Sequence, residues 1–130
     1  MRVVVVGSAG RMGSAVCRAV DADQDLELTA AVDPSSVGSE DPTGTVTVVK
    51  ALEDVDASTV DVMVDFTIAE AARSNIAWCA ANQVHAVVGT SGLNEHDLAI
   101  FEQTFTSSNC LVAPNFAIGA VLLMRFAEMA

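Results

Sequence analysis

The clearest chemical signal in the chain is a glycine-rich segment, Gly7-Ser8-Ala9-Gly10-Arg11-Met12-Gly13. It directly follows four apolar β-branched residues, Val3 to Val6, which are typical of a short buried strand. Unpaired N–H groups at a helix N-terminus attract phosphate, and glycine lets a pyrophosphate approach the backbone closely. The spacing is a variant of the dinucleotide-binding fingerprint, and an ordinary strand-to-helix turn is the alternative. We therefore predict a phosphate-binding loop at this position.

Asp33 is the second residue with a defined chemistry, because it ends another apolar segment twenty residues after Gly13. A carboxylate there can accept hydrogen bonds from the adenine ribose hydroxyls, and it repels a 2′-phosphate. Pro34 supplies no cation for that phosphate, whereas Arg11 could reach across the cleft to it. NADH is therefore the expected cofactor, with NADPH accepted. The alternative is that Asp33 only initiates a turn before Pro34.

The elements that must position these residues alternate along the chain. Strands are predicted at residues 3–6, 26–32, 46–49, 60–64, 85–88 and 111–112, with 46–49 as a short edge strand. Helices are predicted at 11–21, 68–82, 94–105 and from about 117, with a helical turn at 51–54 and an N-cap at Asn94. Strands that alternate with helices imply parallel pairing and right-handed crossovers. The predicted fold is α/β: a Rossmann-type, doubly wound, mainly parallel sheet with helices on both faces.

Ligands of such sheets bind beyond the carboxyl ends of the strands. Five of these ends are distinctive here: the glycine loop, Asp33, Asp65-Phe66-Thr67, Gly89-Thr90-Ser91-Gly92 and Ala113-Pro114-Asn115-Phe116. Small and polar residues gathered at one edge indicate backbone and hydroxyl contacts to a long ligand. Phe66 is either a wall of this site or a core residue that caps the sheet edge. Asn115 either bonds the ligand or organises its own loop.

Composition limits the classes of function. The 130 residues form one predicted domain, and the net charge of −11 argues against nucleic acid or an anionic membrane as a partner. The acids cluster at residues 21–27, 40–41 and 53–61, and these are interpreted as solvated loops and helix ends. No apolar run spans a bilayer, and the chain starts with a strand rather than a signal peptide. The three cysteines are interpreted as free thiols of a cytoplasmic protein, and no metal site is predicted.

The motifs together are similar to those of a known family, the bacterial dihydrodipicolinate reductases (4-hydroxy-tetrahydrodipicolinate reductases) of lysine and diaminopimelate biosynthesis. G-S-A-G-R-M-G, D-F-T, V-V-G-T-S-G and A-P-N-F-A-I-G occur in the order and spacing of that family, and only the loop at 35–45 lies outside the resemblance. The resemblance implies that Gly7 to Met12 hold the pyrophosphate and that Asp33 holds the adenosine ribose. It also implies that Phe66 and Thr67 lie near the nicotinamide ribose, Gly89 to Ser91 near the nicotinamide, and Ala113 to Phe116 beside the carboxamide.

Two residues depart from the family pattern. Ser91 stands where the family usually has threonine, which keeps the hydroxyl. Pro34 stands where members that use NADPH often carry arginine, so the resemblance leaves the selectivity for the 2′-phosphate open.

The activity implied by the resemblance is hydride transfer from NAD(P)H to the dihydrodipicolinate precursor. The family carries a His-His and Lys signature on a second domain that binds the dicarboxylate substrate, and nothing like it follows Phe116. The chain is therefore expected to be the cofactor domain of a homo-oligomeric, tetrameric enzyme, with its last helix cut short and no catalytic residue of its own. Alone, it is expected to bind cofactor without reducing substrate. The alternatives are a stand-alone NAD(P)-binding redox-sensing module and the cofactor domain of another two-domain oxidoreductase.

Overall fold

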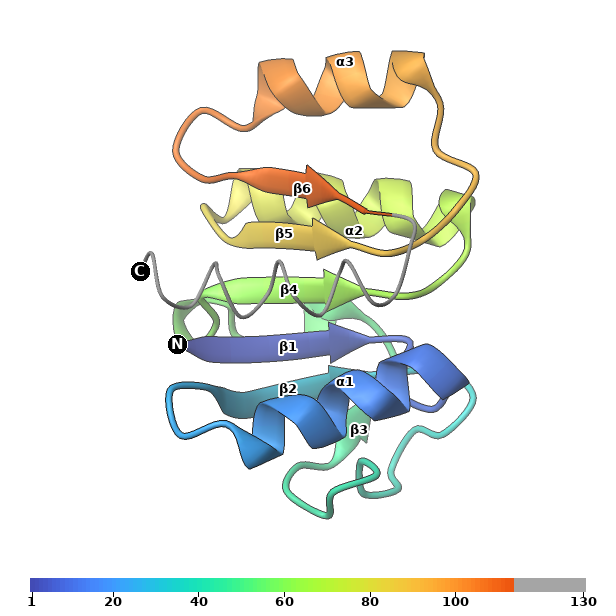
Figure 1. The fold of residues 1–130 in the computed structure, drawn as a ribbon, viewed down its shortest axis with the longest axis vertical. Coiled ribbons are helices and arrows are strands. Elements are labelled where there is room, and N and C mark those ends of the chain that lie inside the picture. Colours follow the sequence, from blue (N-terminus) through green and yellow to red (C-terminus); the bar gives the residue numbers. More distant parts are fainter. Residues whose placement is uncertain (114–130) are drawn as a thin grey trace.

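The computed structural model describes residues 1–113, which form a parallel sheet with helices on its two faces (Figure 1). The strands are β1 (Arg2–Val6), β2 (Glu27–Val32), β3 (Val48–Val49), β4 (Val62–Asp65), β5 (His85–Val88) and β6 (Cys110–Val112). The helices are α1 (Arg11–Ala22), α2 (Ala69–Ala81) and α3 (Glu95–Thr104), with short 3₁₀ helices η1 (Leu52–Asp54) and η2 (Ala57–Thr59). The helix predicted from residue 117 lies outside the described residues.

The order of the strands creates a switch point beside β1. The sheet runs β3-β2-β1-β4-β5-β6, and all five neighbouring pairs are parallel. From β1 the chain moves outward to β2 and β3, then returns to pair β4 with the other edge of β1, matching Val3 with Val62 and Val6 with Asp65. The arrows in Figure 1 point the same way, so all carboxyl ends lie at one edge. The predicted doubly wound parallel sheet is confirmed, and ligands of such sheets bind at this switch point.

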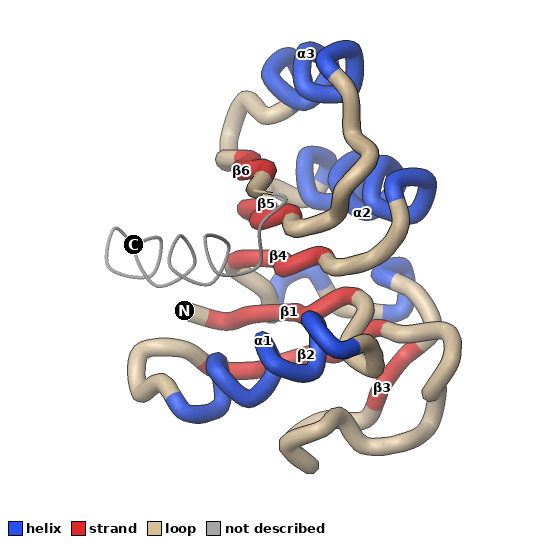
Figure 2. The backbone as a smooth tube through the Cα atoms, turned by 45° about the vertical axis from the view of Figure 1, so that its right-hand side comes forward, coloured by secondary structure: helices blue, strands red, loops and turns tan. Residues whose placement is uncertain are grey.

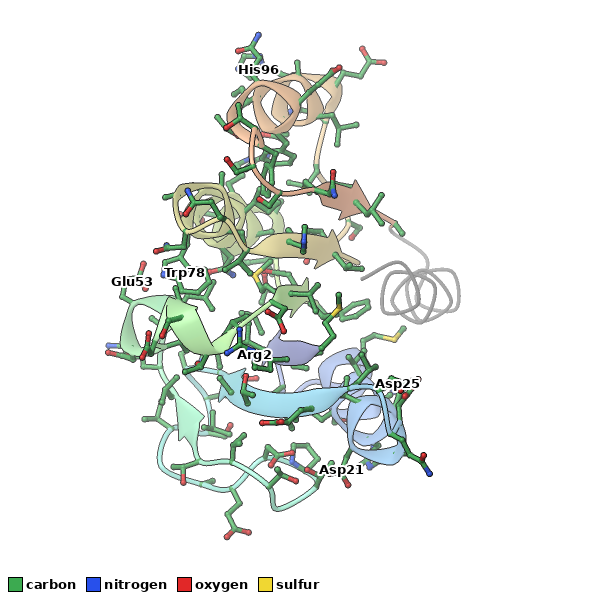
Figure 3. The ribbon with its side chains drawn as sticks, turned by 90° about the vertical axis from the view of Figure 1, so that its left-hand side faces the viewer. Arg2, Asp21, Asp25, Glu53, Trp78 and His96 are labelled. Carbon is green, nitrogen blue, oxygen red and sulfur yellow. The ribbon has the colours of Figure 1, made fainter. Side chains whose placement is uncertain are left out.

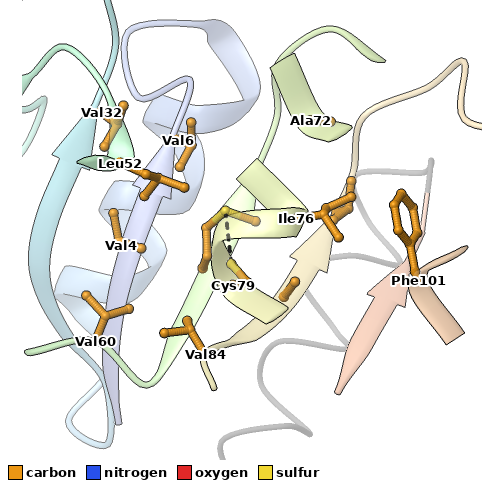
Figure 4. Close-up of a cluster of buried hydrophobic side chains, with 13 residues drawn as sticks. Val4, Val6, Val32, Leu52, Val60, Ala72, Ile76, Cys79, Val84 and Phe101 are labelled. Atoms are coloured by element: carbon orange, nitrogen blue, oxygen red, sulfur yellow. Dashed lines mark hydrogen bonds between the residues drawn. The ribbon is translucent and has the colours of Figure 1, made fainter. Parts of the chain in front are cut away.

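The two faces of the sheet are covered by different helices because successive strand side chains point to opposite faces. Val3 and Val5 of β1 join buried residues of α1, namely Val16, Cys17 and Val20. Val4 and Val6 join a second cluster with residues of α2 and α3, drawn in Figure 4 and including Ala72, Ile76, Cys79 and Phe101. Figures 2 and 3 accordingly show α1 on one side of the sheet and α2 on the other. Trp78 of α2 is half-buried against the second cluster.

The start of α3 confirms the predicted cap. The side chain of Asn94 accepts a hydrogen bond from the N–H of Asp97, and the Asp97 carboxylate accepts one from the N–H of Asn94, each at 2.9 Å. This reciprocal capping box satisfies two N–H groups that the helix cannot pair internally. α1 begins differently, since Gly10 offers no side chain to cap it.

Three local features differ from the sequence prediction. The edge strand predicted at 46–49 is shorter, because β3 covers only Val48–Val49. η2 was not predicted, since so short a polar segment has no periodicity, although Asp56 caps it by accepting from the N–H of Ser58 at 3.0 Å. The interpretation of the acidic clusters as solvated is wrong for Asp41, which is only 4% exposed. Its carboxylate accepts bonds from the N–H groups of Thr43, Thr45 and Val46 and so shapes the loop.

All three cysteines are free thiols, as predicted. Cys17 and Cys79 are buried and Cys110 is half-buried. Burial raises the pKa of Cys17 to about 12 and that of Cys110 to about 11. The Cys79 sulfur lies 3.6 Å from that of Met63 inside the second cluster (Figure 4). These thiols therefore stay protonated and act as small core residues. Among the helices within residues 1–113, none has the length and apolarity needed to cross a membrane.

Candidate nucleotide-binding site

The glycine turn between β1 and α1 is held in close contact with the loop that follows β4. Gly7 has φ +86°, and a Cβ there would overlap the carbonyl oxygen of Phe66. A Cβ at Gly13 would overlap the carbonyl oxygen of Gly7. The N–H of Gly7 donates to the carbonyl of Val32 at 2.8 Å, which ties the turn to the end of β2. Glycine is therefore required for the conformation at residue 7 and for the close approach at residue 13.

The N-terminus of α1 has the properties of an anion site. No side chain caps it, no acid lies in its first turn, and its first N–H groups have no partner within the helix. The Ser8 hydroxyl is wholly buried and has no hydrogen-bond partner within residues 1–113. A buried hydroxyl without a partner is uncommon and costs free energy unless a ligand or water satisfies it. The donors present at this turn fit the pyrophosphate of a dinucleotide.

Asp33 links the end of β2 to the glycine turn. Its Oδ2 accepts a hydrogen bond from the N–H of Ala9 at 2.9 Å, and its Oδ1 accepts from the N–H and the hydroxyl of Ser35 at 2.9 and 2.6 Å. Burial by itself raises the pKa of Asp33, but the bonds from Ser35 and Ala9 outweigh it and leave this pKa below its ordinary value. Asp33 is therefore an ionised carboxylate at neutral pH that both initiates a turn and faces the switch point.

A cleft of about 520 Å³ opens at the switch point. Five of the predicted site residues line it: Gly7, Gly10, Asp33, Phe66 and Thr67. Other predicted residues do not, since Ser8 lies inside the turn while Ala9, Arg11 and Met12 are exposed. The rest of the lining comes mainly from α2 and from the segment after β3, together with Val6, Val32, Pro34 and Ile68. The structure thus brings the glycine turn, the ends of β2 and β4, and two further elements to one cavity.

The sequence left open whether Phe66 is a core residue or a wall of the site, and the structure shows that it is both. It is half-buried against the cluster on the α1 face, and it also lines the cleft. A Cβ at Gly89 would overlap the Phe66 ring, so the loops after β4 and β5 are in direct contact. Phe66 therefore both caps the sheet edge and forms a wall.

The loops after β5 and β6 contribute less to the cleft. Gly89 lies against the ring of Phe66, which lines the cleft, and the neighbouring Thr90 is buried. Ser91 is exposed, and Ala113 is buried with its N–H donating to the carbonyl of Val88 at 2.7 Å. None of these four lines the cleft. Pro114, Asn115 and Phe116 lie outside the described residues.

Two residues that sequence reasoning did not assign to the site, Lys50 and Asn75, line the cleft, and Asp65, which was named only as part of a strand end, supports it. Lys50 directly follows β3 and is the one basic side chain among the described residues that line the cleft, where the acids are Asp33 and Glu53. Asn75 lines the cleft from α2, and the wholly buried Asp65 bonds to it. Lys50 follows the carboxyl end of β3, where ligands of such sheets bind. The sequence did not reveal this, because β3 is too short for its pattern to show where the strand ends. Asp65 stands in a strand end that the sequence singled out, although its role there was not predicted, and Asn75 has no such signal.

The described residues give no indication of a metal site. Among residues 1–113, no three His, Cys, Asp or Glu side chains are arranged to hold a metal ion. The Nδ1 of His85 accepts a hydrogen bond from the N–H of Asn109 at 3.0 Å, and His96 is exposed on α3 (Figure 3).

Comparison with known proteins identifies the family. Residues 1–116 match the sequence model of the family described as "Dihydrodipicolinate reductase, N-terminus". The chain belongs to the dihydrodipicolinate reductase family. Two 4-hydroxy-tetrahydrodipicolinate reductases, from Cutibacterium acnes and Corynebacterium aurimucosum, are each 41% identical over 133 aligned residues, which cover all of this chain and 48% of theirs. A 4-hydroxy-tetrahydrodipicolinate reductase from Streptococcus pneumoniae is 39% identical over 132 aligned residues, which cover all of this chain and 51% of that protein. The chain thus spans about half the length of the curated relatives it matches.

Solved structures agree with this assignment. A dipicolinate-bound dihydrodipicolinate reductase from Paenisporosarcina sp. TG-14 superposes with a TM-score of 0.77 at 33% identity, over all of this chain and 53% of that one. Aspartate semialdehyde dehydrogenase II from Vibrio cholerae shares the fold, with a TM-score of 0.65 at 18% identity over 88% of this chain and 38% of that one. The family resemblance seen in the sequence is confirmed. The chain is the N-terminal, NAD(P)H-binding domain of this reductase family.

Proposed function

We propose that this domain belongs to an intact 4-hydroxy-tetrahydrodipicolinate reductase that reduces the dihydrodipicolinate precursor of lysine and diaminopimelate. The observation that carries the cofactor role is the uncapped N-terminus of α1, with the buried Ser8 hydroxyl beside it, at the switch point of a parallel sheet. Membership of the family supports the reaction. The cofactor, once bound, supplies the hydride from its nicotinamide ring.

The chain's own residues bind and orient the cofactor. The glycine turn and the α1 N-terminus receive the pyrophosphate, and Asp33 accepts from the adenosine ribose hydroxyls. Thr67 and Phe66 flank the nicotinamide ribose, Gly89, Thr90 and Ser91 lie near the nicotinamide, and residues 113–116 lie beside its carboxamide. We assign the proton donor and the dicarboxylate site to a second domain, as the family resemblance implies. The intact protein acts in the cytoplasm as a homo-oligomer, on the family pattern a tetramer.

NADH is the preferred cofactor in this proposal, and NADPH is accepted. The ionised Asp33 disfavours a 2′-phosphate in the same cleft, while Lys50 offsets part of that repulsion. The measurement is a pair of titrations that compare the dissociation constants of NADH and NADPH. A preference for NADPH of about tenfold or more, equal to about 1.4 kcal/mol, would contradict the proposal.

Two variants test the cofactor role. Asp33→Asn removes the charge and puts an amide donor where the N–H of Ala9 now donates, so NADH binding should weaken by about tenfold. Asp56→Asn is the matched control, because Asp56 makes the same two kinds of bond, to Ser58, but is exposed and does not line the cleft. NADH affinity is measured by quenching or enhancement of its fluorescence. A folded wild-type chain that fails to bind NADH would contradict the proposal.

The free-standing sensor is the competing function, and activity distinguishes it. The purified chain, mixed with NADH and the dihydrodipicolinate precursor, should bind NADH without oxidising it. A protein that also carries the second domain should oxidise NADH at a rate that depends on the precursor. Binding of NADH by the longer protein with no turnover would favour the sensor instead.

A further inference from the structure

Asp65, the last residue of β4, is a carboxylate with no exposed surface. No cation pairs with it among residues 1–113, where the ion pairs are Arg2–Asp61 and Arg73–Asp97. Polar side chains satisfy it instead. Its Oδ1 accepts from the hydroxyls of Thr67 and Thr90, each at 2.7 Å, and its Oδ2 accepts from the side-chain amide of Asn75 at 2.7 Å. A buried carboxylate is tolerated only when its oxygens are bonded in this way.

These bonds connect three segments that are separate in the sequence. Thr67 lies in the loop after β4, Thr90 in the loop after β5, and Asn75 on α2. The Thr90 hydroxyl accepts from the N–H of Thr67 at 2.9 Å while it donates to Asp65, which closes a small ring of hydrogen bonds. The N–H of Thr67 also reaches Asp65 Oδ1, at 3.0 Å. Linked bonds in a water-poor interior fix the geometry of every member.

Two members of this network face the cleft. Thr67 and Asn75 both line it, on the β4 side of the glycine turn. Because the amide nitrogen of Asn75 is bonded to Asp65, its carbonyl oxygen points away from the carboxylate and stays available as an acceptor. Asp33 marks the adenosine half on the β2 side, so the β4 side receives the other half of a dinucleotide.

We propose that Asp65 is a positioning residue that holds Thr67, Thr90 and Asn75 in the arrangement that binds the nicotinamide half of the cofactor. The inference rests on the proposed NAD(P)H-binding function and adds the residue that orders one half of the site. Asp65 touches no ligand itself. It acts through the side chains of Thr67, Thr90 and Asn75, which donate to it. Without this carboxylate, these side chains would rotate freely or bond water.

The experiment compares two ligands that share the adenosine half. NADH contains both halves, whereas ADP contains the adenosine and the diphosphate but lacks both the nicotinamide and its ribose. In Asp65→Asn, one oxygen becomes an amide donor that faces existing donors, so the network loses at least one bond. We expect the dissociation constant of NADH, measured by calorimetry, to rise about tenfold while that of ADP stays within about twofold. A general loss of folding would move both constants together.

Two further variants keep the test decisive. Asn75→Ala removes the α2 partner of Asp65 together with a side chain that lines the cleft, so it should also raise the dissociation constant of NADH relative to that of ADP, and it tests the network if Asp65→Asn does not fold. Asp41→Asn is the matched control, because Asp41 is a buried carboxylate that also bonds a threonine two residues on, yet it does not line the cleft. It should leave the ratio of the two constants unchanged. Equal effects on both ligands, or no effect on either, in Asp65→Asn and Asn75→Ala would overturn the role of Asp65. A wild-type protein that binds neither ligand overturns the proposed function and this inference with it.

Discussion

At the scale of residues, one local device recurs at four aspartates. Asp33, Asp41, Asp56 and Asp65 each accept hydrogen bonds from both the N–H and the hydroxyl of the Ser or Thr two residues later. This Asp-x-Ser/Thr turn depends only on neighbours in the chain, so it is readable in the sequence. What each turn serves depends on its surroundings. Two of the four stand at strand ends beside the cleft, one shapes a loop, and one caps a 3₁₀ helix.

Gly13 gives a prediction at this scale. In the interior of a helix, Gly→Ala normally stabilises by up to about 1 kcal/mol. Here the added methyl would overlap the carbonyl oxygen of Gly7, which is backbone and has no room to move. We expect Gly13→Ala to lower the free energy of unfolding by about 2 kcal/mol and to weaken NADH binding. Urea unfolding measures the first effect and fluorescence titration the second.

Gly10→Ala provides the control for this substitution. A Cβ at Gly10 would lie 3.4 Å from the same Gly7 oxygen, an ordinary contact. Its effect on unfolding should stay below about 1 kcal/mol. Equal destabilisation by the two variants would show that the close approach at Gly13 is not what requires glycine.

At the scale of elements, one carboxylate joins two helices. Asp97 completes the capping box of α3, and it also receives both guanidinium donors of Arg73 on α2, at 2.8 and 3.0 Å. The hydrogen bond from Arg73, followed by that from Asn94, lowers the pKa of Asp97 from its ordinary 3.8 to about 2. Capping and docking of α3 thus depend on the same charge.

This lowered pKa predicts how stability depends on pH. The folded protein binds the proton of Asp97 less readily than the unfolded chain, so the stabilisation is fully present above about pH 4 and is lost as the pH falls toward 2. The difference in unfolding free energy between wild type and Asp97→Asn should therefore be constant near neutral pH and shrink across that window. Chemical unfolding at a series of pH values measures it. A difference that persists unchanged at pH 2 would refute the role of the charge.

Arg73→Gln is the companion variant. It removes the largest cause of the shift but leaves the capping box in place. The loss of stability should still begin at about pH 4, where the unfolded chain starts to bind the proton, but it should be smaller than in wild type and end at a higher pH.

At the scale of the whole molecule, the net charge opposes the ligand. The chain carries −11, and a dinucleotide is itself an anion. The α1 region escapes this imbalance, since residues 3–20 contain Arg11 and Arg18 and no acid. Binding must therefore rely on the oriented N–H groups at the glycine turn, which act at short range, rather than on a long-range attractive field.

Salt provides the whole-molecule prediction. Raising the ionic strength from about 0.01 to about 0.15 M shortens the screening length from about 30 to about 8 Å. Long-range repulsion by the acids fades, whereas contacts at the turn remain, so the affinity for NADH should rise modestly. A titration at several salt concentrations measures this. A steep fall with salt, as in proteins that bind phosphates mainly through surface cations, would contradict it.

Much of the fold and part of the site were predictable from neighbours in the sequence. The glycine turn, the Asn94 cap and the alternation of strands and helices each depend on residues a few positions apart, and the structure confirms them. The limits of β3 were missed, because two residues of strand carry almost no pattern and gain their pairing from β2. The burial of Asp41 was missed for a similar reason, since its partners matter only once the loop has closed.

The sequence by itself determined the α/β class, the glycine turn and the residues at the strand ends, because strand periodicity, helix capping and glycine conformation are local properties. Tertiary structure alone decided the order of the strands, the entry of Lys50 into the cleft and the union of Thr90 and Asn75 around Asp65. Those relations join residues 10 to 25 positions apart or more. They form only when the parallel crossovers bring the ends of separate strands to one edge, a condition that no short stretch of sequence contains.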